Sequence, residues 1–264
     1  MPHHSAQYTC IALNSSSPNP PLPWLQNTQD FPSTRQTWGR DSDAPGLLCA
    51  GGDLGTARLH SAYARGIFPW FSADQPILWW SPDPRMVLHV SEFQVSASFK
   101  KTLRRFSKSS NCEVRFDSAF QQVIESCANA SRDGQCGTWI MPEMVDAYLA
   151  LHLNGLAHSV EIWVSGRLVG GLYCVALGKA VFGESMFHLA TDASKIALAA
   201  LIGFCRQHHL PQIDCQQNTR HLASLGAREV SRDVFEARIA GLVLQTAPPW
   251  EFSPIYWNYL LANR

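Results

Sequence analysis

Two acidic residues stand in otherwise apolar segments, where an acid can either do chemistry or hold the structure. Glu184 lies in the run FGESMF, and Asp214 lies in the run LPQIDCQ. A carboxylate is costly to bury unless it is paired. Glu184 is therefore either one half of an internal salt bridge or a residue of a functional site. Asp214 is either a strand-end carboxylate that holds a neighbouring helix or a reacting group.

Aromatic and basic side chains gather in two further segments. The stretch GIFPWFSADQPILWWSPDPR, from Gly66 to Arg85, places many aromatic rings on backbone that its prolines keep from forming a clean helix or strand. We expect Trp79 and Trp80 to pack in the core. The segment SFKKTLRRFSKSS concentrates positive charge on one short helix. Such rings can stack on unpaired bases and such charges can bind phosphates, but core packing and a solvated helix face are the simpler interpretations.

Composition excludes several classes of protein. The chain has 264 residues, 21 basic and 21 acidic side chains and a formal net charge of +0, so no global field draws it to a polyanion. Its apolar runs are shorter than the ~20 residues of a membrane span. The 8 Cys contain no C-x-x-C pair, and the 10 His have no metal-ligand spacing. We expect a cytoplasmic protein with buried thiols and without a metal.

The pattern of elements predicts an α/β (α+β) protein. Residues 1–40 form an irregular arm, 41–92 a small N-terminal α+β domain, and 93–264 a domain with a mixed sheet and a C-terminal tail. In the last domain a helix beginning at Pro142 precedes three antiparallel strands, SVEIWV, RLVGGLYCVALG and AVFGESMF. A helix over 193–207 then crosses to LPQIDCQ, which makes the two central strands parallel. This order is typical of an N-acetyltransferase-like (GNAT) domain.

Ten short blocks, in order, carry a resemblance to a known family. They are GLLCAGGDL, AYARGIFPWF, PILWWSPDPR, GTWI, HSVEIW, LVGGLY, FGESMF, ASK, IDCQ and HLASLGA, between Gly46 and Ile239. Together they resemble leucyl/phenylalanyl-tRNA–protein transferases, bacterial enzymes that move Leu or Phe from tRNA onto proteins with N-terminal Arg or Lys and so mark them for N-degron proteolysis. The resemblance implies no metal and no organic cofactor, with Leu-tRNA, Phe-tRNA and such proteins as partners. We expect a monomer.

The resemblance also implies catalytic residues. Asp214 is the proposed activator, with Gln216 beside it, and a strand would point both side chains to one face. With an unperturbed pKa of about 3.9, an aspartate is a weak base and orients the amine more than it deprotonates it. Glu184 is the second acid. Whether it meets the acceptor side chain, the amine or the terminal adenosine stays open.

Binding residues follow from the same resemblance. The pocket for the transferred side chain must be apolar, and it maps to Leu172, Val181, Gly183 and Met186; many family members have Met and Phe at the first two positions. The tRNA 3′ end maps to Tyr63, Phe68, Trp70, Trp139 and Tyr148. The tRNA body maps to Lys100, Lys101, Arg104, Arg105 and Lys108.

Three alternatives compete with this interpretation. A CoA-dependent N-acetyltransferase would explain NTRHLASLGA, but such enzymes open their long helix with a glycine-rich phosphate loop, and this chain has FHLATDASK there. An aminoacyl-tRNA-dependent ligase of cell-wall peptides would lack the GIFPWF and WWSPDPR blocks. A non-catalytic RNA-binding module would keep its function without Asp214, whereas an enzyme would lose turnover.

Overall fold

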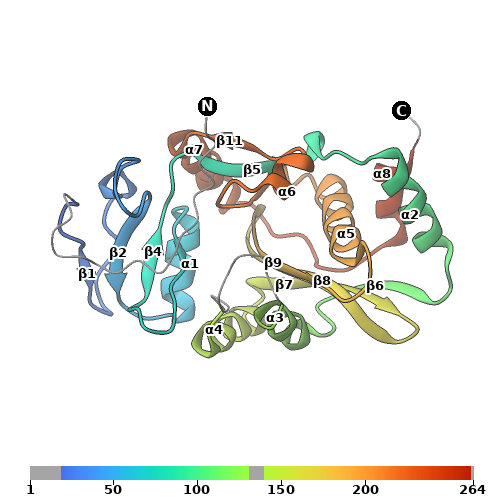
Figure 1. The fold of residues 1–264 in the computed structure, drawn as a ribbon, viewed down its shortest axis with the longest axis horizontal. Coiled ribbons are helices and arrows are strands. Elements are labelled where there is room, and N and C mark those ends of the chain that lie inside the picture. Colours follow the sequence, from blue (N-terminus) through green and yellow to red (C-terminus); the bar gives the residue numbers. More distant parts are fainter. Residues whose placement is uncertain (1–18, 131–139, 263–264) are drawn as a thin grey trace.

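Two β-sheets organise the protein in the computed structural model, which describes residues 19–130 and 140–262 (Figure 1). A four-stranded sheet has the order β1-β2-β4-β3, and a seven-stranded sheet has the order β11-β5-β10-β9-β8-β7-β6. Within the described residues, no helix has the length and apolar character needed to cross a membrane. The predicted α/β class with a mixed sheet is confirmed.

The smaller sheet carries the aromatic loop. Trp79 and Trp80 are 0% and 2% exposed, as expected of core residues, and Phe31 meets Trp79 edge-on with ring centroids 4.7 Å apart. Gly66 ends the first helix with φ 71, a left-handed conformation that glycine adopts without steric cost. The elements of this part are β1 (Trp24–Leu25), β2 (Leu47–Gly51), α1 (Thr56–Ala64), β3 (Phe68–Pro69) and β4 (Leu78–Trp80).

The predicted irregular arm is partly regular. Residues 1–18 lie outside the described part, but β1 pairs in parallel with β2, and Phe31 and Trp38 are buried. The Arg65 guanidinium donates to the carbonyls of Phe31 and Pro32 at 2.9 and 2.8 Å. Polar composition misled the prediction because a few aromatic anchors and arginine bonds to carbonyls are enough to fix a segment without a hydrophobic pattern of its own.

The larger sheet follows the predicted strand order. Strands β7 and β8 form a hairpin, β9 is antiparallel to β8, and α5 crosses over to β10, which is parallel to β9. The second half of the chain therefore matches expectation in order and direction. These elements are β7 (Ala157–Val164), β8 (Arg167–Leu177), β9 (Ala180–His188), α5 (Ala193–Gln207), β10 (Gln212–Asp214), α6 (Arg220–Ser224) and β11 (Arg228–Val230).

One strand lies on the other side of the predicted domain boundary. The strand β5 (Arg85–His89) falls within 41–92, yet it pairs with β10 and β11 in the larger sheet. We therefore propose a boundary near residue 84 instead of 92. The sheet also has an edge strand that the sequence analysis did not predict, β6 (Cys112–Phe116), although its sequence CEVRF alternates apolar and polar residues.

Helices cover both faces of this sheet (Figure 1). The helices α3 (Phe120–Ala128) and α4 (Pro142–Leu153) lie on one face and α5 on the other. The C-terminal segment, which the sequence left unplaced, packs against α5 through η3 (Pro254–Trp257) and α8 (Asn258–Leu261). The basic helix α2 (Ala97–Lys108) lies beside α8, at the opposite end of the molecule from β1. Helix α7 (Arg232–Leu242) packs its Phe235 against Gly66.

Candidate active site

The two predicted acids meet where the parallel strands β9 and β10 separate. Their pairing ends at Phe182 and Asp214. Beyond that point the backbone after β10 bonds to β5, through Cys215 and Gln216 with Met86. Glu184 on β9 and Gln216 in the turn after β10 each lie two residues past the last pair. Both residues therefore lie where the two strands are no longer paired.

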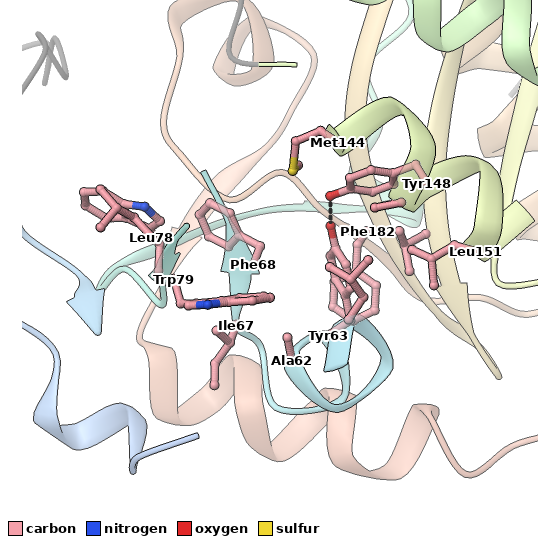
Figure 2. Close-up of a cluster of buried hydrophobic side chains, with 14 of the residues drawn as sticks. Ala62, Tyr63, Ile67, Phe68, Leu78, Trp79, Met144, Tyr148, Leu151 and Phe182 are labelled. Carbon is pink, nitrogen blue, oxygen red and sulfur yellow. Dashed lines mark hydrogen bonds between the residues drawn. The ribbon is translucent and has the colours of Figure 1, made fainter. Parts of the chain in front are cut away.

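Two buried tyrosines hold Glu184 on its strand. Tyr63 of α1 donates its phenol hydrogen to Oε1 of Glu184 at 2.8 Å, and Tyr148 of α4 donates to Oε2 at 3.1 Å. The two phenol oxygens also lie within hydrogen-bonding distance of each other, and Figure 2 shows them pointing toward one another from their two helices, with Phe182 beside Tyr63. Because each phenol carries one hydrogen, the two phenols serve two of these three contacts at a time while Glu184 is ionised. The pair links the two parts of the protein through the carboxylate.

Burial sets the electrostatics of this cluster. The pKa of Glu184 is raised to about 7, first by burial and also by the nearby Asp214, while the hydrogen bonds from Tyr63 and Tyr148 and the charge of Arg85 act in the opposite direction. The pKa values of both phenols are raised well above 10, first by burial and then by the charge of Glu184. At neutral pH the phenols are therefore donors, and Glu184 is close to half ionised.

This raised pKa gives a stability prediction. The unfolded state ionises Glu184 near its ordinary pKa of 4.5, but the folded state resists ionisation until about 7, so the folded wild type loses stability as pH rises through that interval. Glu184→Gln cannot ionise. We expect its melting temperature to exceed that of the wild type at pH 8 and to approach it at pH 4.5. A difference that stays constant with pH would contradict this electrostatic picture.

Asp214 is bonded by an arginine that the sequence did not single out. Arg85 donates from Nε to Oδ1 at 2.8 Å and from Nη2 to Oδ2 at 2.6 Å, and the two side chains are 0% and 1% exposed. The guanidinium also donates to the Gly66 carbonyl at 2.9 Å and lies over the rings of Phe68 and Phe235. One buried side chain thus ties the aromatic loop to β10. The sequence feature that could have identified Arg85 is its position in the apolar strand RMVLHV, because a buried cation requires a buried partner just as the Glu184 carboxylate does.

Gln216 does not follow Asp214 on a continuous strand. Strand β10 ends at Asp214, and Gln216 has φ 53, in the left-handed region. The expectation that a strand points both side chains to one face is wrong here. Instead, the Gln216 backbone N–H donates to Oδ1 of Asp214 at 3.0 Å. Asp214 therefore holds the turn that presents Gln216.

Four of the five residues predicted for the tRNA 3′ end are described, and three of these are buried. Tyr63 and Tyr148 are 0% exposed and Phe68 is 6% exposed, beneath Arg85. The faces of these three rings are covered in this structure, and their assignment to the tRNA 3′ end stays a prediction. Trp70 is half-buried, and its carbonyl accepts from the Trp80 indole at 2.7 Å. Trp139 lies outside the described residues.

The predicted pocket residues divide into two groups. Leu172 and Val181 are buried in the core cluster built around α5, whereas Gly183 and Met186 are half-buried along the part of β9 beyond its pairing with β10. A Cβ at Gly183 would approach Ile213 Cγ2 to 3.3 Å, so the glycine lets the two strands come together where they begin to separate. Gly183 and Met186 thus lie on the same stretch as Glu184.

The predicted tRNA-body residues all lie on α2. Its Leu103 and Phe106 are buried, Lys100 is half-buried, and the other four basic residues are exposed. Within the described segments, no group of three or more His, Cys, Asp and Glu is arranged to hold a metal ion. The six described cysteines are free thiols, and burial raises the pKa of Cys215, next to Asp214, to about 12.

Comparison with known proteins decides the family. A sequence model of leucyl/phenylalanyl-tRNA protein transferase matches residues 87–240, and a model of that family's N-terminal domain matches residues 52–83. The chain belongs to the leucyl/phenylalanyl-tRNA–protein transferase family. The two matches meet at the start of β5, next to the boundary that sheet membership suggests.

Relatives of that name match almost the whole chain. The leucyl/phenylalanyl-tRNA–protein transferase of Albidiferax ferrireducens is 62% identical over 93% of this chain and 97% of its own length. That of Leptothrix cholodnii is 57% identical over 90% of this chain and 95% of its own length. Among solved structures, FemX is similar with a TM-score of 0.43 and 12% identity over 67% of each chain, which is too distant to add to the argument.

Proposed function

We propose that this protein transfers Leu or Phe from aminoacyl-tRNA to the α-amine of proteins with N-terminal Arg or Lys, in the cytoplasm and as a monomer, and so marks them for N-degron proteolysis. The proposal is supported by the positions of Glu184 and Gln216, just past the last paired residues of β9 and β10, in a chain of this family. The reaction needs no ATP, because the ester of aminoacyl-tRNA is already activated.

The site must align a neutral amine with the ester carbonyl. An α-amine has a pKa of about 7.7–8.0, so an appreciable fraction is neutral near pH 7. The side chain of Gln216 aligns the amine, and Asp214 acts through the turn that it holds, since both its oxygens accept from Arg85. Leu172, Val181, Gly183 and Met186 receive the Leu or Phe side chain, and Trp70 forms the wall for the terminal adenosine.

A transfer assay tests this proposal. Purified protein is mixed with radiolabelled Leu-tRNA and a peptide that begins with Arg, and in parallel with the same peptide acetylated at its N-terminus. Label should move to the free-amine peptide alone. An RNA-binding module without catalysis would retain tRNA and leave all the label on it, and that result would defeat the proposal.

The basic helix gives a separate prediction for tRNA binding. Lys101, Arg105 and Lys108 are exposed on α2, and each phosphate contact that is lost reduces the slope of log K against log salt by roughly 0.7–0.9. Replacing all three by Ala should reduce the slope for tRNA binding by about 2–3. Binding isotherms at several salt concentrations measure it.

A matched variant removes three exposed arginines elsewhere, Arg35, Arg40 and Arg167. Its slope should stay within experimental error of the wild type. Equal slope changes in the two triple variants would mean that α2 is no special tRNA contact and that only total charge matters.

A further inference from the structure

We propose that Glu184, rather than Asp214, accepts the proton that the attacking α-amine must lose. This inference rests on the proposed aminoacyl transfer and assigns one step of it. As the N–C bond forms and the C–O bond to the ribose breaks, the proton passes from the amine nitrogen to a carboxylate oxygen of Glu184. It then passes to the departing ribose oxygen, which regenerates the carboxylate.

The bonding of Asp214 argues against that role for it. Both of its oxygens accept from a guanidinium that is itself 0% exposed, and one also accepts the Gln216 N–H. Protonating Asp214 would leave Arg85 buried without a counter-charge, which is costly. Its exposed fraction of 1% also keeps it from touching a substrate without a rearrangement of β10.

Glu184 has the opposite surroundings. Its partners are neutral phenols that use one acceptor position on each oxygen, and an ionised carboxylate offers about four such positions. It lies on the half-buried stretch of β9, two residues past the last pair with β10, and Gln216 likewise lies two residues past that pair in the chain after β10. In this inference, an amine aligned by Gln216 meets a carboxylate with accepting capacity to spare.

The surrounding groups favour a proton acceptor that works near neutral pH. The titratable groups that contact Glu184 are Tyr63 from α1 and Tyr148 from α4, and the charged pair Asp214 and Arg85 lies on β10 and β5. Burial raises the pKa values of both phenols, so neither competes for the proton as an anion. The pKa of Glu184, about 7, lies close to that of the α-amine, which favours proton transfer between them.

Single-turnover transfer from Leu-tRNA to an Arg peptide, measured from pH 5.5 to 9, tests this inference. The wild type needs a neutral amine and an ionised Glu184, so log rate should rise with a slope of about two below pH 6.5. Glu184→Gln should transfer about 10²–10⁴-fold more slowly, with a slope of about one, because only the amine still titrates. Half-saturation by tRNA and by peptide should change little, as expected if the loss lies in the chemical step.

Rescue separates chemistry from structure. Glu184→Asp keeps the acid and should restore the slope of about two at a reduced rate. Added formate should accelerate Glu184→Ala and leave the wild type unaffected. Two results would overturn the inference. One is a Glu184→Gln rate within about threefold of the wild type with the slope of about two retained, and the other is a failure of both rescues. In either case, transfer by the wild type would leave the proposed function intact. Absence of transfer by the wild type would instead defeat the function itself.

Discussion

Replacing Arg85 by Met should lower the free energy of unfolding by about 3–5 kcal/mol, because the change leaves the Asp214 carboxylate buried without its counter-ion. The Gly66 carbonyl loses its donor as well. Denaturant titration measures the loss, and transfer activity should fall with it, since the turn that presents Gln216 is held by Asp214. Arg85→Lys should be intermediate, because an ammonium cannot make the two parallel bonds.

The chain offers a matched control in Arg115. This arginine also bonds a carboxylate, Glu113 at 2.8 Å, and lies over an aromatic ring, Trp163, but its side chain is 39% exposed. Arg115→Met should cost no more than about 1 kcal/mol, as is usual for surface ion pairs. Similar losses for the two variants would show that burial of the Arg85–Asp214 pair does not determine its contribution.

Replacing both members of the buried pair should separate stability from activity. In Arg85→Met with Asp214→Leu, no charge remains buried at this position, and apolar replacements of buried ion pairs are often neutral or stabilising. We expect the double variant to regain most of the stability that Arg85→Met loses. Transfer should nevertheless stay depressed by about 10²-fold or more, because Gln216 has lost the acceptor of its backbone N–H and misplacement by about 1 Å can cost that much.

The comparison of the two variants has a clear contrary outcome. If the double variant recovered transfer together with stability, Asp214 would contribute nothing to placing Gln216, and the pair would serve the fold alone. If it recovered neither, the steric fit of the two apolar side chains would be the limiting factor. The smaller variant Arg85→Met with Asp214→Ala would then reveal whether relieving that crowding restores folding without restoring transfer.

The sequence predicted those parts of the fold whose patterns are local. The hairpin of β7 and β8 alternates and turns at Ser165-Gly166, and α5 begins and ends where its apolar periodicity does, so both matched. The ordered segment around Phe31 depends on contacts with distant residues and was missed; strand β6 was also missed, although its sequence CEVRF carries a short local alternation. The same limit applied to the site: Glu184 and Asp214 were found, but Arg85 was not, because its partner lies 129 residues away.

Side-chain roles were harder to predict than positions. A strand periodicity places Asp214 and Gln216 on one face, but the left-handed backbone at Gln216 breaks the alternation. Aromatic residues near a binding site suggest stacking, but whether a ring keeps an open face depends on its neighbours, and the packing around Tyr63 and Tyr148 leaves only their hydroxyls for polar contacts. Glu184 belongs to a phenol-bonded cluster rather than to the salt bridge that a buried acid usually suggests.

Mass-spectrometric sequencing of the acceptor peptide after incubation with Leu-tRNA tests the central claim most directly. Acceptors that begin with Arg, Lys and Ala are compared, and the Arg and Lys peptides should each gain one Leu, joined by a peptide bond to the N-terminal α-amine. The Ala peptide should stay unmodified. Unmodified Arg and Lys peptides, or Leu attached to the lysine side chain, would contradict the account.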